Sequence, residues 1–239
     1  MPTQLGKVLI YTLVPVVAGG LGGIVAAFWP PTPPVRSAVQ HFAAGVVLAA
    51  AALELLPQVR HQSPWIAVIG FTIGIGAMLA LRALTTRWKT SHDDRNGVAF
   101  GLIAATGVDI LIDGVVVGSG FASAQQTGLL LVIALVLEFF FLGLSVATTM
   151  GAVARWQIIL MPTGLATLVL VGAAVGTITL QNAAAPIVAT VLAFGAVALM
   201  YLVTEELLTE AHEVAETLWG TSLFFVGFLA FLIITELIG

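Results

Sequence analysis

Residues 97–122 read GVAFGLIAATGVDILIDGVVVGSGFA, an apolar stretch whose only charged residues are Asp109 and Asp113. A helix needs roughly 20 mostly apolar residues to cross a bilayer, and this stretch is long enough. The two carboxylates fall near its middle, at the depth where a charge is most costly. The stretch therefore predicts a transmembrane helix that carries acidic groups at mid-membrane.

The composition of the whole chain also indicates a membrane protein. Its 239 residues are 59% hydrophobic and 8% charged, whereas a soluble domain carries about 25% charged residues. This composition excludes an ordinary soluble enzyme, a nucleic-acid-binding protein and a disordered tail. The chain has no Cys, which excludes a disulfide framework, a Cys-based zinc site and a thiol nucleophile.

Apolar stretches of the required length predict eight transmembrane spans, at residues 7–28, 38–56, 64–84, 97–122, 127–152, 158–178, 186–209 and 220–239. The polar segments between them are short, so they leave no room for an extramembrane domain. We therefore expect an all-α polytopic membrane protein that forms a single transmembrane domain over residues 1–239.

The basic residues predict the orientation of this bundle, because cytoplasmic loops are enriched in Lys and Arg. With the N-terminus outside, the outer side holds Lys7 and Arg60, and the inner side holds Arg36, Arg82, Arg87, Lys89, Arg95 and Arg155. We therefore expect an integral protein of the cell (inner) membrane with both termini outside. The tryptophans fall at or near span ends, as interfacial anchors do: Trp29, Trp65, Trp88, Trp156 and Trp219.

Every Lys and Arg lies in a loop or at a span end, but Asp109, Asp113 and Glu138 lie near the middle of the fourth and fifth spans. Three such groups facing lipid would cost on the order of 8–10 kcal/mol. Asp109 and Asp113 are one helical turn apart, so they repel each other unless a cation or a shared proton lies between them. We expect a bound cation; the alternative is a set of protonated acids hydrogen-bonded between helices.

Further polar residues extend this site toward both membrane surfaces. Glu54 lies toward the outer end of the second span, where it either belongs to a cation pathway or pairs with Arg60 and His61. His41, at the inner end of the same span, is either an exit ligand or an interfacial residue. The inner end of the seventh span adds Glu205, Glu206, Glu210 and His212. This series predicts an anionic route for a cation through the bundle.

A short internal repeat accompanies these acids. Residues 54–57 (ELLP) resemble residues 206–209 (ELLT), and a His follows each of them, His61 or His212. The two spans run in opposite directions under the predicted topology. This is the arrangement of an inverted repeat, a common plan among transporters.

These features resemble the ZIP family of metal transporters (zinc-regulated, iron-regulated transporter-like proteins). Residues 42–57 (FAAGVVLAAAALELLP) resemble that family's second span, and residues 200–212 (MYLVTEELLTEAH) its seventh. Residues 109–114 (DILIDG) stand where the fourth span carries His-Asn-x-Pro-Glu-Gly, and residues 138–143 (EFFFLG) where the fifth carries His-Glu-x-Pro-Glu-Gly. The resemblance implies a ZIP-like inverted-repeat bundle and a possible homodimer. It also implies alternating access, in which the second, fourth, fifth and seventh spans move against the other four.

The resemblance also implies the metal ligands. Asp109 takes the place of the first His, Asp113 of the first Glu and Glu138 of the second His, so one metal position would be kept. The groups that would build a second, adjacent position are replaced by Ile110, Phe139 and Leu142. We therefore expect one metal at mid-membrane. Three carboxylates suit Mn, Mg or Fe(II), and they discriminate less well in favour of Zn.

We expect a transporter of divalent metal cations (Zn, Fe, Mn or similar), with the metal as transported substrate, no cofactor and no enzymatic activity. Because the ligands must be deprotonated to bind metal, transport should weaken at acid pH. One alternative is a non-transporting or proton-handling membrane protein that keeps a ZIP-like fold, which the missing Pro-Glu-Gly motifs favour. Another is an intramembrane enzyme using Asp109 and Asp113 as an acid–base pair, although the chain lacks the common hydrolase motifs.

The glycines offer a separate prediction about helix packing. Residues 19–23 and Gly70, Gly74 and Gly76 would permit close helix contacts, either within one chain or between the two chains of a dimer.

Overall fold

The computed structural model describes residues 4–91, 98–149, 154–214 and 218–238. Within these ranges the protein is all-α, and eight segments are long and apolar enough to cross a membrane, as predicted. Five of them are continuous helices: α1 (Gln4–Phe28), α4 (Pro64–Ser91), α5 (Val98–Ser123), α6 (Gln125–Thr149) and α11 (Leu218–Ile238). The third predicted span ends at residue 84, but α4 continues to Ser91, because a helix does not have to end where its apolar stretch does.

The other three spans are interrupted helices. The second consists of α2 (Pro33–Ala50), the π-helical turn η1 (Ala51–Leu55) and α3 (Leu56–Arg60). The sixth consists of α7 (Arg155–Ala166) and α8 (Leu168–Leu180), and the seventh of α9 (Ala185–Leu202), the π-helical turn η2 (Val203–Leu207) and α10 (Leu208–Ala211). Two of the three therefore contain a π-helical turn, a feature found frequently at functional sites.

The two π-helical turns bear out the internal repeat at the level of the backbone. Glu54 is the fourth residue of η1, and Glu206 is the fourth residue of η2. Pro57 lies two residues after the end of η1. It has no backbone N–H, so it needs no carbonyl partner in the preceding, wider turn. At the corresponding place after η2, the Thr209 hydroxyl donates a hydrogen bond of 3.1 Å to the carbonyl of Thr204, five residues earlier.

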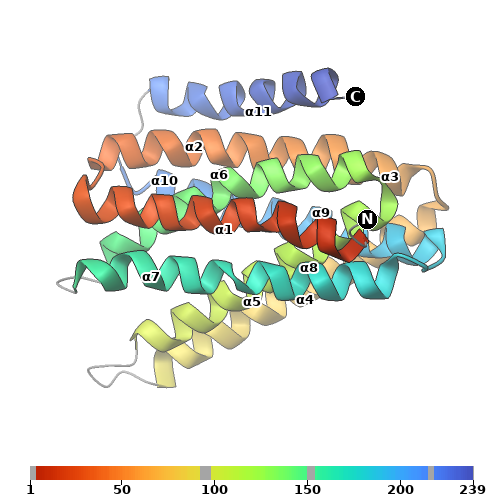
Figure 1. Cartoon of the computed structure of the whole chain (residues 1–239), viewed down its shortest axis with the longest axis horizontal. Coiled ribbons are helices and arrows are strands. Elements are labelled where there is room, and N and C mark those ends of the chain that lie inside the picture. Colours follow the sequence, from red (N-terminus) through yellow and green to blue (C-terminus); the bar gives the residue numbers. More distant parts are fainter. Residues whose placement is uncertain (1–3, 92–97, 150–153, 215–217, 239) are drawn as a thin grey trace.

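Tight packing joins spans that are distant in the sequence: α1 packs on α6, α2 on α11, α4 on α9, and α5 on α8 (Figure 1). Successive spans alternate in direction, so the two helices of each pair run parallel. The four pairs join spans 1 and 5, 2 and 8, 3 and 7, and 4 and 6. If spans 1, 2 and 3 are exchanged with spans 6, 7 and 8, and span 4 with span 5, each pair becomes another pair of the same set. The packing therefore has the pseudo-symmetry of an inverted repeat.

Glycines allow the paired backbones to approach closely. A Cβ atom added to Gly22 would collide with the backbone of Phe140, and one added to Gly143 with the backbone of Gly19. The other pairs use glycines in the same way, at Gly45 and Gly227, Gly114 and Gly172, and Gly70. Gly74 contacts Val197 of α9, whereas Gly76 has nothing within 4 Å. Apart from Gly76, the glycines expected at close helix contacts pack within the chain.

Helices α1 and α11 place their terminal ends, Gln4 and Ile238, at the same end of the bundle (right in Figure 1). This agrees with an even number of spans. Trp29, Trp65, Trp156 and Trp219 are exposed, as interfacial anchors would be. Four residues used to predict the orientation lie outside the described side chains: Arg87, Trp88, Lys89 and Arg95.

Candidate metal centre

Three carboxylates meet in the interior of the bundle. Asp109 and Asp113 lie four residues apart on one face of α5, and Glu138 lies on α6, which packs against α5. One carboxylate oxygen from each of the three lies within 4.8 Å of the others. The structure therefore brings together the three residues that the sequence analysis selected, and we call them the carboxylate cluster.

The carboxylate cluster is deeply buried and incompletely hydrogen-bonded. Asp113 is 3% exposed, Glu138 is 6% exposed and Asp109 is half-buried. Asp113 Oδ2 and Glu138 Oε2 are buried without a hydrogen-bond partner. Buried polar atoms are almost always paired, so these two carboxylate oxygens need a proton, a water molecule or a cation as a partner.

Two basic side chains of the described residues, Arg36 and Arg82, form ion pairs away from the carboxylate cluster. Arg36 pairs with Glu213 at 3.5 Å and Arg82 pairs with Glu205 at 2.6 Å, so neither bridge neutralises the carboxylate cluster. Several ionised carboxylates at this spacing repel one another strongly in a medium of low dielectric constant. The charge has to be balanced by protons or by a cation.

The geometry of the carboxylate cluster fits a single cation. Oxygen ligands bind divalent metals at about 2.0–2.6 Å, so two ligands of one ion can be no more than roughly 5 Å apart. The ligand oxygens of the carboxylate cluster lie within 4.8 Å of one another, which meets this condition for the longer metal–oxygen bonds. Bonds of about 2.1 Å to a smaller ion such as Mg²⁺ would draw the oxygens closer together. A set of three carboxylates is typical of hard cations such as Mg²⁺ and Mn²⁺.

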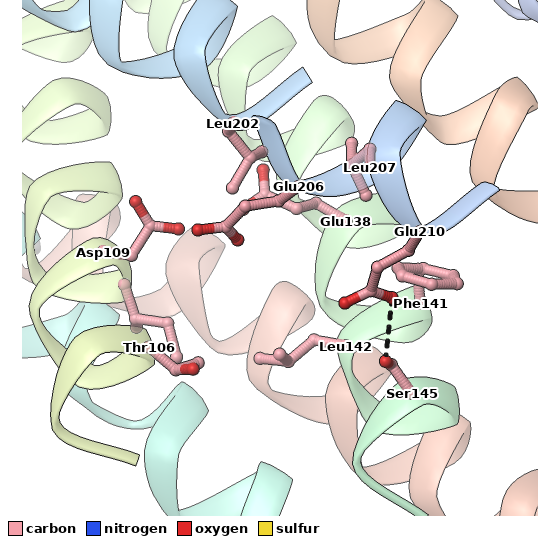
Figure 2. Close-up of a pocket in the computed structure, with 11 residues that line it drawn as sticks. Thr106, Asp109, Glu138, Phe141, Leu142, Ser145, Leu202, Glu206, Leu207 and Glu210 are labelled. Atoms are coloured by element: carbon pink, nitrogen blue, oxygen red, sulfur yellow. Dashed lines mark hydrogen bonds between the residues drawn. The ribbon is translucent and has the colours of Figure 1, made fainter. Parts of the chain in front are cut away.

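A cavity of about 60 Å³ extends from the carboxylate cluster toward the end of the bundle opposite the two termini. Figure 2 shows the carboxylates of Asp109 and Glu206 facing each other across it, with Glu138 beside them. One water molecule needs about 10–15 Å³ of such space, so the cavity has room for a cation with a few waters. Glu206 lines the cavity and is exposed, so the cavity is not sealed from the surface.

Glu210 lines the far part of the same cavity and is held by side chains from two other helices. Its Oε2 accepts hydrogen bonds from Gln40 Nε2 of α2 at 2.8 Å and from Ser145 Oγ of α6 at 3.1 Å. Figure 2 shows the Ser145 bond as a dashed line. Glu210 thus ties α10 to α2 and α6 at this end of the bundle.

Three of the predicted pathway residues lie away from the cavity. Glu205 points outward to Arg82 of α4, although its neighbour Glu206 lines the cavity. Glu54 is 6% exposed and accepts a hydrogen bond of 3.2 Å from Thr235 of α11, while no ion pair joins it to Arg60 or His61 among the described residues. His212 lies against the ring of His41.

Sequence reasoning missed several polar residues that complete the site. Thr106 lies three residues before Asp109, and Ser145 lies seven residues after Glu138, so each shares the helix face of its acid. This spacing would have been sufficient to find them. Gln40 carried no such signal, because its contact with Glu210 joins residues 170 positions apart.

The three residues that the resemblance places at a second metal position have apolar side chains. Ile110 and Leu142 line the cavity, and Phe139 is fully buried in the core. None of them has a ligand atom, so they add no metal ligand to the carboxylate cluster.

No model of a known protein family matches the chain, and no characterised protein matches it in sequence.

Proposed function

We propose that the protein transports divalent metal cations and binds them at Asp109, Asp113 and Glu138. The observation that carries this proposal is the buried carboxylate cluster with two orphaned oxygens at the head of a cavity. A charged group inside a membrane protein is by default a functional group on an ion or substrate pathway. A divalent cation would balance the carboxylates and use the orphaned oxygens as ligands.

The cavity supports movement of the ion toward one side of the membrane. Glu206 and Glu210 add acidic groups between the carboxylate cluster and the end of the bundle opposite the termini. The basic residues predict that this end is cytoplasmic. With the inverted repeat, this favours alternating access of the kind that the resemblance to the ZIP family implies. The present conformation then corresponds to the inward-facing state.

The test is metal uptake by purified protein in liposomes. We expect saturable influx of at least one ion from a panel of Mn²⁺, Fe²⁺, Zn²⁺, Cd²⁺, Co²⁺ and Mg²⁺, and at least a tenfold loss in Asp109→Ala. Glu236→Gln removes an exposed carboxylate at the end of α11 and serves as the control, with influx close to that of the wild type. No saturable influx of any metal, or influx unchanged in Asp109→Ala, would contradict the proposal.

The alternative of a proton-handling protein gives a different result in the same liposomes. An internal pH dye would then report proton flux in the absence of metal, and that flux would fall in Asp109→Ala. Metal transport through the carboxylate cluster instead requires the metal and saturates with it.

A further inference from the structure

A second cluster of polar groups lies at the end of the bundle opposite the termini, beyond the carboxylate cluster. His41 of α2 and His212, which follows α10, have ring centroids 5.3 Å apart with the rings at 66°. His41 lies within α2 and is 3% exposed. We call His41 and His212 the histidine pair.

The contacts of His41 show which of its two ring nitrogens carries a hydrogen atom. His41 Nδ1 lies 2.8 Å from the carbonyl oxygen of Ser37. A carbonyl only accepts, so Nδ1 carries the proton and donates it. In the neutral ring this leaves a lone pair on Nε2, and Nε2 is buried without a hydrogen-bond partner. An N–H of imidazole bonded to a backbone carbonyl, with the other nitrogen open, is the arrangement that fixes a histidine as a metal ligand.

The distance between the two rings fits a shared metal ion. Two imidazole nitrogens that bind one Zn²⁺ tetrahedrally at about 2.0–2.1 Å place their ring centroids roughly 5 Å apart. The observed separation of 5.3 Å is close to this value. The Ser37 hydroxyl also donates to the carbonyl of Ala211 at 2.8 Å, which holds the two histidine-bearing segments together.

Polar side chains connect the histidine pair to the cavity. Glu210 lines the cavity and accepts from Gln40, the neighbour of His41 in the sequence. Glu210 and Glu213 flank His212 in the sequence and supply negative charge at this end, part of which Arg36 balances through Glu213. The histidine pair therefore lies one residue from Gln40 on α2 and two residues from Glu210 on the seventh span.

We propose that His41 and His212 form a second metal-binding position, specific for borderline transition metals such as Zn²⁺. Imidazole nitrogen binds Zn²⁺ well and Mg²⁺ poorly, whereas the carboxylate cluster does not discriminate in this way. Two protein ligands leave coordination positions open for water, so the ion can be exchanged. This position differs from the carboxylate cluster in its ligands and its place in the fold.

The test is equilibrium binding of Zn²⁺ to purified full-length protein in detergent, in a background in which two of the three carboxylates of the carboxylate cluster are neutralised. In Asp113→Asn/Glu138→Gln, one Zn²⁺ per chain should remain bound by calorimetry, and Mg²⁺ should not compete for it. Adding His212→Ala or His41→Gln should weaken this binding at least tenfold. Since His212 is exposed, its replacement should leave folding intact, and His41→Gln keeps a side chain that can donate to Ser37.

His61→Ala is the matched control, because His61 is an exposed histidine at the opposite end of the bundle, and it should leave binding unchanged. Zn²⁺ binding that persists in both His41→Gln and His212→Ala, or no Zn²⁺ binding in the background variant, would overturn the proposal. Because the readout is binding, it is independent of transport: failure of liposome uptake would leave the Zn²⁺ result unaffected, and the converse also holds.

Discussion

Asp113 and Glu138 are the two residues whose environment most needs an explanation. Each is almost fully buried, and each has a carboxylate oxygen without a hydrogen-bond partner. A buried carboxylate without a cation lowers the free energy of unfolding. Natural proteins keep such destabilising groups mainly at functional sites. A substitution that removes one of these charges should therefore raise the stability of the protein and lower its function.

Asp113→Asn keeps the shape of the side chain and removes one negative charge from the carboxylate cluster. Without metal, we expect the variant to melt at a higher temperature than the wild type, by the few degrees that about 1–2 kcal/mol represents. Thermal unfolding in detergent with a chelator measures this. Adding Mn²⁺ should raise the melting temperature of the wild type and not that of the variant. Glu236→Gln should show neither effect; a variant that melts lower and still responds to Mn²⁺ would contradict the cation site.

Protons and metal ions compete for the same carboxylate oxygens. The acidic groups that face the cavity or the carboxylate cluster are Asp109, Asp113, Glu138, Glu206 and Glu210. Lowering the pH from about 7.5 to about 5.5 protonates a larger fraction of them, so the initial rate of Mn²⁺ uptake should fall several-fold. Uptake by proteoliposomes at matched internal pH measures this. A rate that stays constant as the pH falls would argue against carboxylate ligation.

At the scale of the helices, close backbone contact holds each parallel pair together. Lipid offers no hydrophobic driving force between helices, so association depends on van der Waals contact through small residues. Gly143 of α6 meets the backbone of α1 near Gly19, Gly22 and Gly23. Glu138 lies on the same helix, so this contact also positions the carboxylate cluster.

Gly143→Ala should separate α6 from α1 and lower the stability by about 1–3 kcal/mol, because the added methyl group meets backbone that cannot move aside. Gly76→Ala is the control, since a Cβ atom there has nothing within 4 Å. Thermal unfolding of the two variants in detergent measures the difference. Equal melting temperatures would show that the α1–α6 contact does not depend on glycine.

The π-helical turns explain why neighbouring acids have different roles. Glu205 and Glu206 both belong to η2, yet Glu205 reaches Arg82 and Glu206 lines the cavity. Adjacent residues on a helix point about 100° apart, and the extra residue of a π-turn sets which one faces inward. From the sequence both acids were candidates for the pathway, because the π-turn leaves no clear mark in the residues themselves.

For the whole molecule, the orientation in the membrane follows from charges in the loops, and single-cysteine labelling tests it directly. The chain contains no Cys, so each introduced thiol is unique. Ser63 follows α3 and Ala154 precedes α7, at opposite ends of the bundle, and both are exposed. In intact cells, an impermeant maleimide should label Ser63→Cys and not Ala154→Cys. The reverse pattern would place the termini inside and turn the cavity toward the exterior.

The extent of sequence prediction differs between the fold and the site. The eight spans were predictable because apolar length is a local property of the chain. Asp109 and Asp113 could be placed on one face because helical periodicity is also local. The partners of Glu54, Glu210 and His212 lie on other spans, at Thr235, Gln40 and His41, and no pattern in the sequence indicated them.

The order of residues along the chain was thus sufficient to establish an all-α membrane protein, its spans and the depth of three acids within them. The tertiary structure decided that Glu138 lies within 4.8 Å of both aspartates, that Glu206 and not Glu205 lines the cavity, and that His41 meets His212. The physical reason is that apolar length and helical periodicity act over a few turns of one helix. The rotation of one helix against another depends on glycine contacts and π-helical turns shared between segments far apart in the chain.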